Sequence, residues 1–138
     1  MMISRNILIV AARYCSAIAG GTAMSLSSVR DANIDPQGTF KYILIKVQDK
    51  TNKNEKLIVR GYKKCPYHMD IFDETSKELP GYNLECLGGG RIKHDPTKKE
   101  ILVYGYSQGY GKADHQKSVD ILKKQLPDYK ITFSDEGY

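Results

Sequence analysis

Alternating apolar and polar residues predict β-strands over much of the chain after residue 38. Turn-forming residues bound these runs, beginning with Asp35-Pro36-Gln37-Gly38 ahead of the first. Lys41 begins the first strand on the same face as the β-branched residues that follow it at every second position. The runs predicted as strands are residues 40–47, 56–62, 82–87, 91–94, 100–106 and 129–134.

Two segments change from the two-residue period of a strand to the spacing of a helix. The first begins at about His68 and is stopped by Pro80-Gly81, and the second covers residues 113–126 and is stopped by Pro127. The positions predicted to face inward are Ile71, Phe72, Thr75 and Leu79 in the first helix and Val119, Leu122 and Leu126 in the second. His68 therefore falls at a helix N-terminus, where backbone N–H groups lack intrahelical partners.

Strands that pair mostly as hairpins, with two helices between them, indicate an α+β fold. We expect a mainly antiparallel or mixed β-sheet flanked by two α-helices. A chain of 138 residues, 41% of them hydrophobic, is of the size that builds one core. We therefore expect a single domain over residues 34–138, preceded by an N-terminal extension over residues 1–33.

The extension is basic, because its first 30 residues contain three arginines and no Asp or Glu. Its apolar stretch, residues 6–24, is interrupted by Arg13, so no uninterrupted run in it approaches the ~20 residues that a membrane-spanning helix needs. A flexible extension, a mitochondrial targeting segment over residues 1–30 and a secretory signal all fit this composition. Otherwise we expect a cytoplasmic protein without a membrane partner.

The net charge of +5 is not spread evenly along the chain. Three of the 21 basic residues lie in the first 30 positions. The rest of the chain has 18 basic and 16 acidic residues, so its net charge is +2. This near balance disfavours a nucleic-acid partner, although the ten tyrosines and a pI of about 9.0 would suit a module for single strands. Three cysteines at no regular spacing favour reduced thiols in an intracellular protein.

The sequence does not match several known catalytic and metal-binding motifs. Cys86 and Arg91 have one intervening residue too few for the phosphate loop of cysteine phosphatases. Cys65 and His68 could supply two metal ligands, but no second spaced pair accompanies them. We expect neither a metal nor another cofactor.

One constellation remains, in which Lys41, His68 and Ser107, with the backbone of Gln108 and Gly109, surround an anion. Free N–H groups with added hydroxyl and ammonium donors suit a phosphate. The helix dipole and a nearby lysine should lower the pKa of His68, and a neutral imidazole can act as a nucleophile or general base. Alternatively, His68 is a surface histidine and Lys41 only caps its strand.

At these residues the sequence resembles the phosphohistidine phosphatase family, which includes the sex-regulated Janus and Ocnus proteins, and it is most similar to the Janus-A branch. The matching motifs are Phe40-Lys41-Tyr42, Ile58-Val59-Arg60-Gly61, Tyr67-His68-Met69-Asp70-Ile71-Phe72, Glu85-Cys86-Leu87-Gly88-Gly89-Gly90-Arg91-Ile92, Val103-Tyr104-Gly105-Tyr106-Ser107, Asp128-Tyr129 and Asp135-Glu136-Gly137-Tyr138.

The resemblance implies metal-independent removal of phosphate from phosphohistidine, with histidine-phosphorylated proteins as partners, by a monomer. It assigns His68 as the catalytic proton acceptor and Lys41, Ser107, Gln108 and Gly109 as phosphate-binding residues. The supporting residues that it implies are Tyr67, Met69, Arg91 and His115. It also implies a role in sex differentiation, for which a non-catalytic regulator that binds phosphoproteins in sex-specific development is the alternative.

Two residues depart from the family pattern. Met69 stands where the phosphatases have a small residue, and Gly109 stands for a residue similar to alanine. Both changes keep the backbone donors but alter the shape of the expected pocket.

Overall fold

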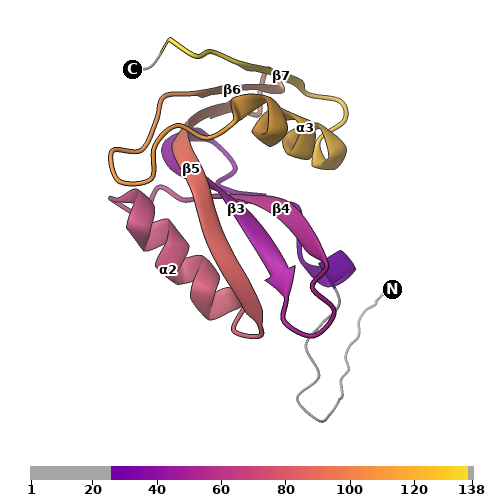
Figure 1. The fold of residues 1–138 in the computed structure, drawn as a ribbon. Helices are drawn as coiled ribbons and strands as arrows, with labels where there is room; N and C mark the ends of the chain where they lie inside the picture. Colours follow the sequence, from indigo (N-terminus) through magenta and orange to yellow (C-terminus); the bar gives the residue numbers. More distant parts are fainter. Residues whose placement is uncertain (1–25, 137–138) are drawn as a thin grey trace.

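Residues 26–136 are described by a computed structural model, in which a six-stranded mixed sheet is flanked by two α-helices. Figure 1 shows α2 and α3 against different parts of the curled sheet. The helices are α2 (His68–Glu78) and α3 (His115–Gln125). The strands are β2 (Ala32–Ile34), β3 (Gly38–Asp49), β4 (Glu55–Gly61), β5 (Tyr82–Asp95), β6 (Glu100–Tyr104) and β7 (Lys130–Phe133), and the short 3₁₀ helix η2 is Leu26–Ser28.

The strand order is β2-β4-β3-β5-β6-β7. The two long central strands, β3 and β5, pair antiparallel from Gly38↔His94 to Asp49↔Tyr82, with one register shift at Leu44/Ile45. β4 and β6 extend the sheet antiparallel on either side, and β2 and β7 add parallel edges. The sheet is therefore mixed but mainly antiparallel, which confirms the predicted α+β fold.

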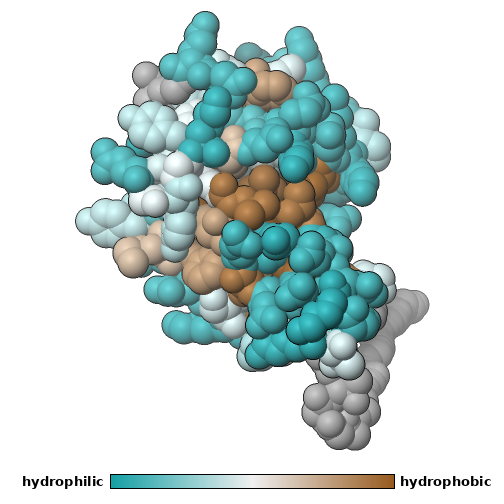
Figure 2. Space-filling view, viewed as in Figure 1, coloured by the Kyte–Doolittle hydropathy of each residue, from teal (hydrophilic) through white to brown (hydrophobic). Residues whose placement is uncertain are grey.

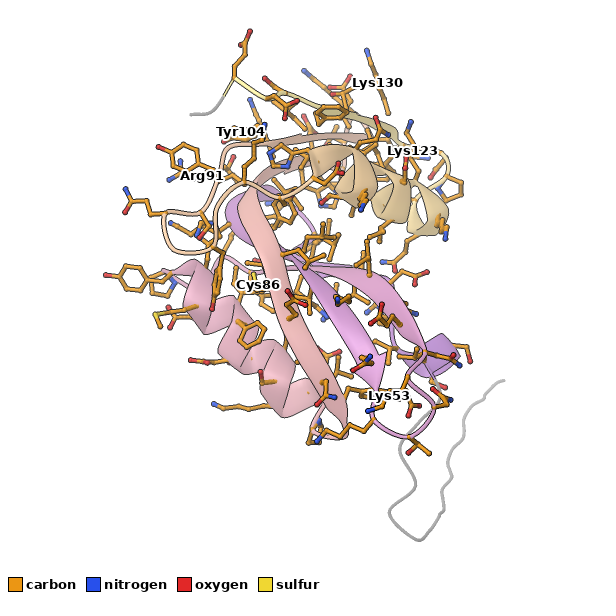
Figure 3. All side chains as sticks on the ribbon, viewed as in Figure 1. Lys53, Cys86, Arg91, Tyr104, Lys123 and Lys130 are labelled. Atoms are coloured by element: carbon orange, nitrogen blue, oxygen red, sulfur yellow. The ribbon has the colours of Figure 1, made fainter. Side chains whose placement is uncertain are left out.

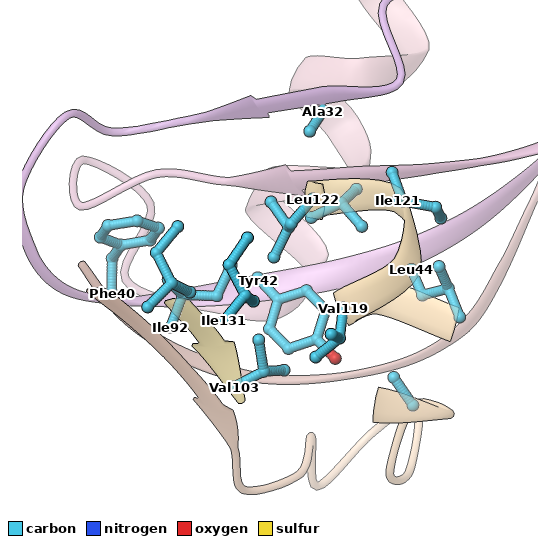
Figure 4. Close-up of a cluster of buried hydrophobic side chains, with 13 residues drawn as sticks. Ala32, Phe40, Tyr42, Leu44, Ile92, Val103, Val119, Ile121, Leu122 and Ile131 are labelled. Atoms are coloured by element: carbon cyan, nitrogen blue, oxygen red, sulfur yellow. The ribbon is translucent and has the colours of Figure 1, made fainter. Parts of the chain in front are cut away.

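Both faces of the sheet are buried, each under a different helix. Alternate residues of β3 divide between the faces: Tyr42 and Leu44 join the cluster under α3, whereas Ile43 and Ile45 join the cluster under α2. Figure 4 shows the first cluster, in which the Tyr42 ring lies among aliphatic side chains from β6 and α3. Because a strand buried on both faces has no polar side, the alternation in the sequence identified only one of its two apolar faces.

The predicted elements agree with the observed ones to within a few residues at each end. Residues 82–87 and 91–94 form one strand, β5, because Gly88–Gly90 continue its pairing with β3. Of the four residues predicted to face inward from the first helix, Ile71, Thr75 and the C-cap residue Leu79 are buried, and Phe72 is partly buried against the same cluster.

The N-terminal part of the described chain contributes to the sheet. β2 pairs with β4, and Val29 and Ala32 are buried in the two clusters. The sequence analysis did not predict this short strand and placed most of it in the extension. Residues 1–25 of that extension lie outside the described residues.

The surface seen in Figure 2 has hydrophobic side chains in its middle and hydrophilic ones above and below. Among residues 26–136, no helix has both the length and the apolar character needed to cross a bilayer.

Candidate functional site

A pocket of about 650 Å³ opens where the N-terminus of α2 meets β3, β5 and the loop after β6. It brings together eight of the nine residues predicted from the sequence, and the ninth, His115, lies behind it. The lining residues are Lys41, Pro66, Tyr67, His68, Met69, Arg91, Tyr106, Ser107, Gln108, Gly109 and Tyr110.

His68 is the first residue of α2 and is 8% exposed, so the alternative of a surface histidine is wrong. Its Nε2 lies 3.0 Å from the carbonyl oxygen of Gly90. Because a carbonyl oxygen only accepts, Nε2 carries the proton in the neutral ring and Nδ1 holds the lone pair. Nδ1 makes no hydrogen bond to any of the residues that the structure describes.

The imidazole of His68 packs directly on the backbone of β5, which only a glycine allows. A Cβ at Gly89 would lie 2.8 Å from His68 Cδ2 and 2.7 Å from the Tyr42 carbonyl oxygen. Gly88 has a φ of +147°, and a Cβ there would meet the backbone of Lys112 and Ala113 at 2.7 to 2.8 Å. The glycine triplet Gly88–Gly90 thus permits a close approach of the His68 ring and of the loop after β6 to the backbone of β5.

Burial is the main cause that lowers the pKa of His68 below its ordinary value of 6.5. The Gly90 hydrogen bond raises this pKa, whereas the positive charges of Lys41 and Arg91 lower it further. The direction agrees with the prediction from the sequence, but desolvation is the largest cause. The ring is therefore neutral at pH 7, with a free lone pair on Nδ1.

Lys41 and Arg91 lie directly opposite each other on β3 and β5, and Tyr104 of β6 is opposite Arg91. Residues opposite each other in an antiparallel pair project to the same face, so both cations lie on one side of the sheet. Figure 3 shows Arg91 and Tyr104 together near the loop above the start of α2. The pocket therefore has a positively charged wall beside His68.

The loop after β6 is held to β5 by backbone hydrogen bonds. Gly89 N–H donates to the Gly111 carbonyl at 2.9 Å, and Ala113 N–H donates to the Gly89 carbonyl at 3.1 Å. Within the loop, Ser107 N–H donates to Gly111, and Ser107 Oγ accepts from Tyr110 N–H at 3.1 Å. The hydroxyl proton of Ser107 remains as a donor.

The N–H groups of Gln108 and Gly109 make no hydrogen bond among residues 26–136. Both residues are exposed at the turn of the loop, and they line the pocket. Two neighbouring free donors of this kind suit an anion.

His115 supports the pocket from behind, through a buried network. Its Nε2–H donates to the Gly105 carbonyl at 2.9 Å, so Nδ1 accepts from the Tyr42 hydroxyl at 2.7 Å. The Tyr42 oxygen in turn lies 2.9 Å from Ser118 Oγ. This chain of bonds ties the loop start at Gly105 to β3 and α3.

Three lining residues, Pro66, Tyr106 and Tyr110, were not predicted as part of the site. Each lies within two residues of a predicted one, and Tyr106 immediately precedes Ser107. The sequence also did not reveal the partner of His68, because Gly90 is 22 residues away on another element.

Comparison with known proteins shows the family to which the chain belongs. The sequence profile of the Janus/Ocnus family (Ocnus) matches residues 26–130. The chain is 46% identical to the 14 kDa phosphohistidine phosphatase of Sus scrofa over 123 residues, which cover 84% of this chain and 98% of that protein. It is 51% identical to the sex-regulated protein janus-A of Drosophila yakuba over 117 residues, which cover 83% and 85%. The janus-A protein of Drosophila melanogaster is 49% identical over the same shares of both chains. The profile covers most of the described fold and every residue of the pocket, and the relatives cover more than four fifths of the chain. The chain therefore belongs to the Janus/Ocnus family.

Proposed function

We propose that this protein is a protein phosphohistidine phosphatase that needs no metal ion. The observation that carries the proposal is His68: a buried, neutral imidazole whose Nε2–H is held by Gly90, with Nδ1 free beside two cations. The name of the Sus scrofa relative supports the same activity.

The phosphoryl group is bound by donors from three elements. Lys41 and Arg91 offset its negative charge from the sheet, and the Ser107 hydroxyl and the N–H groups of Gln108 and Gly109 donate to its oxygens. Phosphoryl transfer depends mainly on such positioning and on stabilisation of the equatorial oxygens. Direct hydrogen bonds to a charged phosphoryl group are strong, so five donors suffice to fix it.

His68 acts through Nδ1 in either of two ways. As a general base, it takes a proton from the water that attacks phosphorus while the P–N bond of the substrate breaks, and the leaving imidazole nitrogen is protonated. As a nucleophile, Nδ1 forms a bond to phosphorus as the same P–N bond breaks, and water then releases the phosphate. Trapping a phosphorylated His68 during turnover distinguishes the second path from the first.

The test is hydrolysis of a phosphohistidine peptide by the wild type and by His68→Ala, with and without a chelator. We expect the chelator to change nothing and His68→Ala to lose roughly 10²- to 10⁴-fold in kcat. His94→Gln is a matched control, because His94 is equally buried at 8% but bonds Asp35 and Tyr129 away from the pocket. A folded His68→Ala protein with wild-type turnover would contradict the proposal.

A non-catalytic role as a binder of phosphoproteins is the second candidate. It is favoured by the janus-A relatives, which are as similar to this chain as the phosphatase and are named sex-regulated proteins. The same assay separates the two functions, since retention of the phosphopeptide without release of phosphate supports the binder.

A further inference from the structure

Large hydrophobic side chains are exposed at four positions of the described chain, and three of these lie at the pocket. Tyr67 is 66% exposed, Met69 59% and Tyr106 42%, and all three line it. The fourth, Phe133 on β7, is 38% exposed and does not line the pocket. Exposed apolar side chains that gather around one opening mark a binding surface. We call Tyr67, Met69 and Tyr106 the apolar rim.

The apolar rim comes from the two elements that carry the polar groups of the site. Tyr67 and Met69 are the neighbours of His68 at the start of α2, and Tyr106 immediately precedes Ser107 in the loop after β6. A phosphorylated side chain that reaches both His68 and Ser107 therefore brings its own backbone neighbours against the rim.

The size of the pocket also exceeds what a phosphoryl group needs. Its volume of about 650 Å³ lies in the range of sites that enclose drug-sized ligands. A phosphoryl group takes up only the space of a few water molecules, at ~30 Å³ each. The remaining space adjoins apolar side chains, so it suits apolar groups of the ligand.

The charges of the lining restrict those groups further. The lining contains Lys41 and Arg91 but no Asp or Glu. The two cations repel a basic neighbour of the phosphorylated residue, and the phosphoryl group already offsets their charge, so an acidic neighbour gains little.

We propose that the apolar rim binds apolar residues next to the phosphohistidine, so that the substrates are protein segments with a leucine-like side chain beside the modified histidine. This inference rests on the proposed function, from which it takes phosphohistidine as the group bound in the pocket. The selectivity is a property of binding, so it holds for a phosphoprotein binder as well as for a phosphatase. Met69 is its main determinant, because it is exposed at the pocket, follows His68 in α2 and is flexible enough to pack against varied apolar shapes.

The test uses three peptides that carry a non-hydrolysable phosphohistidine analogue flanked on both sides by Leu, Ser or Lys, with affinity measured by fluorescence anisotropy. We expect the Leu peptide to bind about tenfold more tightly than the Ser peptide, the effect of partly burying one aliphatic side chain. We expect the Lys peptide to bind most weakly.

Two rim variants and one control locate the effect. Met69→Ser and Tyr106→Ser should each reduce the ratio of Leu- to Ser-peptide affinity, whereas Phe133→Ser removes an exposed hydrophobic side chain outside the pocket and should keep the ratio. Using a ratio for each protein cancels losses that come from phosphate binding or from reduced folding.

The outcomes separate this inference from the proposed function. Equal affinity for the Leu and Ser peptides overturns the apolar rim as a selective surface, even if phosphohistidine peptides are hydrolysed. A Leu preference with no hydrolysis supports the rim and overturns the phosphatase. Self-association that Met69→Ser abolishes, without a peptide preference, would mean that a second copy of this chain covers the rim and would also overturn the proposal.

Discussion

The Nε2 atom of His68 lies 3.0 Å from the carbonyl oxygen of Gly90, so the first residue of α2 is oriented by the central strand β5. This bond fixes the tautomer of the ring and leaves Nδ1 without a partner among the described residues. The same strand also fixes the other side of the pocket. Gly89, which precedes Gly90, is hydrogen-bonded through its backbone to the loop that carries Ser107. One short stretch of β5 therefore sets the distance between the imidazole and the loop.

Lys41→Ala should lower kcat/KM for a phosphohistidine peptide. The expected loss of transition-state stabilisation is roughly 2 to 4 kcal/mol, the cost of removing one preorganised donor. Lys93→Ala is the matched control. Lys93 is exposed two residues after Arg91 on the same face of β5, but it does not line the pocket. A loss below about tenfold for Lys41→Ala would mean that Lys41 only caps β3.

The pKa of His68 should respond to the charge of Lys41. Because burial and the two cations hold this pKa below 6.5, activity should fall only as the pH drops below 6.5. Lys41→Met removes one cause of the lowering and should move the pKa of His68 upward, measured as the shift of its ring C–H signals in an NMR titration. Lys93→Met should leave that titration where it is in the wild type, and an equal effect of both variants would refute a local interaction with Lys41.

The low pKa of His68 also has a consequence for stability. Below pH 6.5 the unfolded chain binds a proton at this residue before the folded chain does, so the free energy of unfolding should decrease as the pH falls. His68→Gln removes the titrating group, and the difference in unfolding free energy between it and the wild type should therefore shrink toward acidic pH, as urea denaturation can measure. A constant difference from pH 7 down through the folded pKa would contradict the lowered pKa.

Gly89→Ala and Gly109→Ala should differ sharply in their effect on folding. A Cβ at Gly89 would lie 2.7 Å from the backbone oxygen of Tyr42, which cannot yield easily, whereas a Cβ at Gly109 would meet nothing within 4 Å. We expect Gly89→Ala to reduce the free energy of unfolding by about 1 to 3 kcal/mol through overpacking. Gly109→Ala should stay within about 0.5 kcal/mol of the wild type in the same urea titration. Similar values for the two variants would disprove the close approach of β5 to β3 and His68.

Tyr42→Phe should destabilise the protein through His115. The change leaves the buried Nδ1 of His115 without its donor, which costs about 1 to 3 kcal/mol. Tyr82→Phe is a matched control, because the Tyr82 hydroxyl is buried without a hydrogen-bond partner among the described residues. Removing that hydroxyl should be neutral or stabilising. If both variants lose the same stability, the network around His115 contributes nothing specific.

Much of the fold could be predicted because it is encoded by local periodicity. The alternation in β3 and β4, the spacing of Ile71 and Thr75 in α2, and Pro127 after α3 each act within a few residues. β2 was missed because its three residues are too short to show a period, and it is held by parallel pairing to β4. Its stability comes from partners that are distant in the sequence.

The features of the candidate site likewise separate into those set by neighbouring residues and those set by residues distant in the sequence. The sequence by itself determined that His68 begins a helix and that glycines precede Arg91, since both follow from neighbouring residues. Only the tertiary structure decided that His68 is buried and that its Nε2–H donates to the Gly90 carbonyl oxygen. It also decided that Lys41 lies opposite Arg91. The physical reason is that burial and hydrogen-bond partners depend on strand register, and the pairing of β3 with β5 sets that register across some fifty residues of chain.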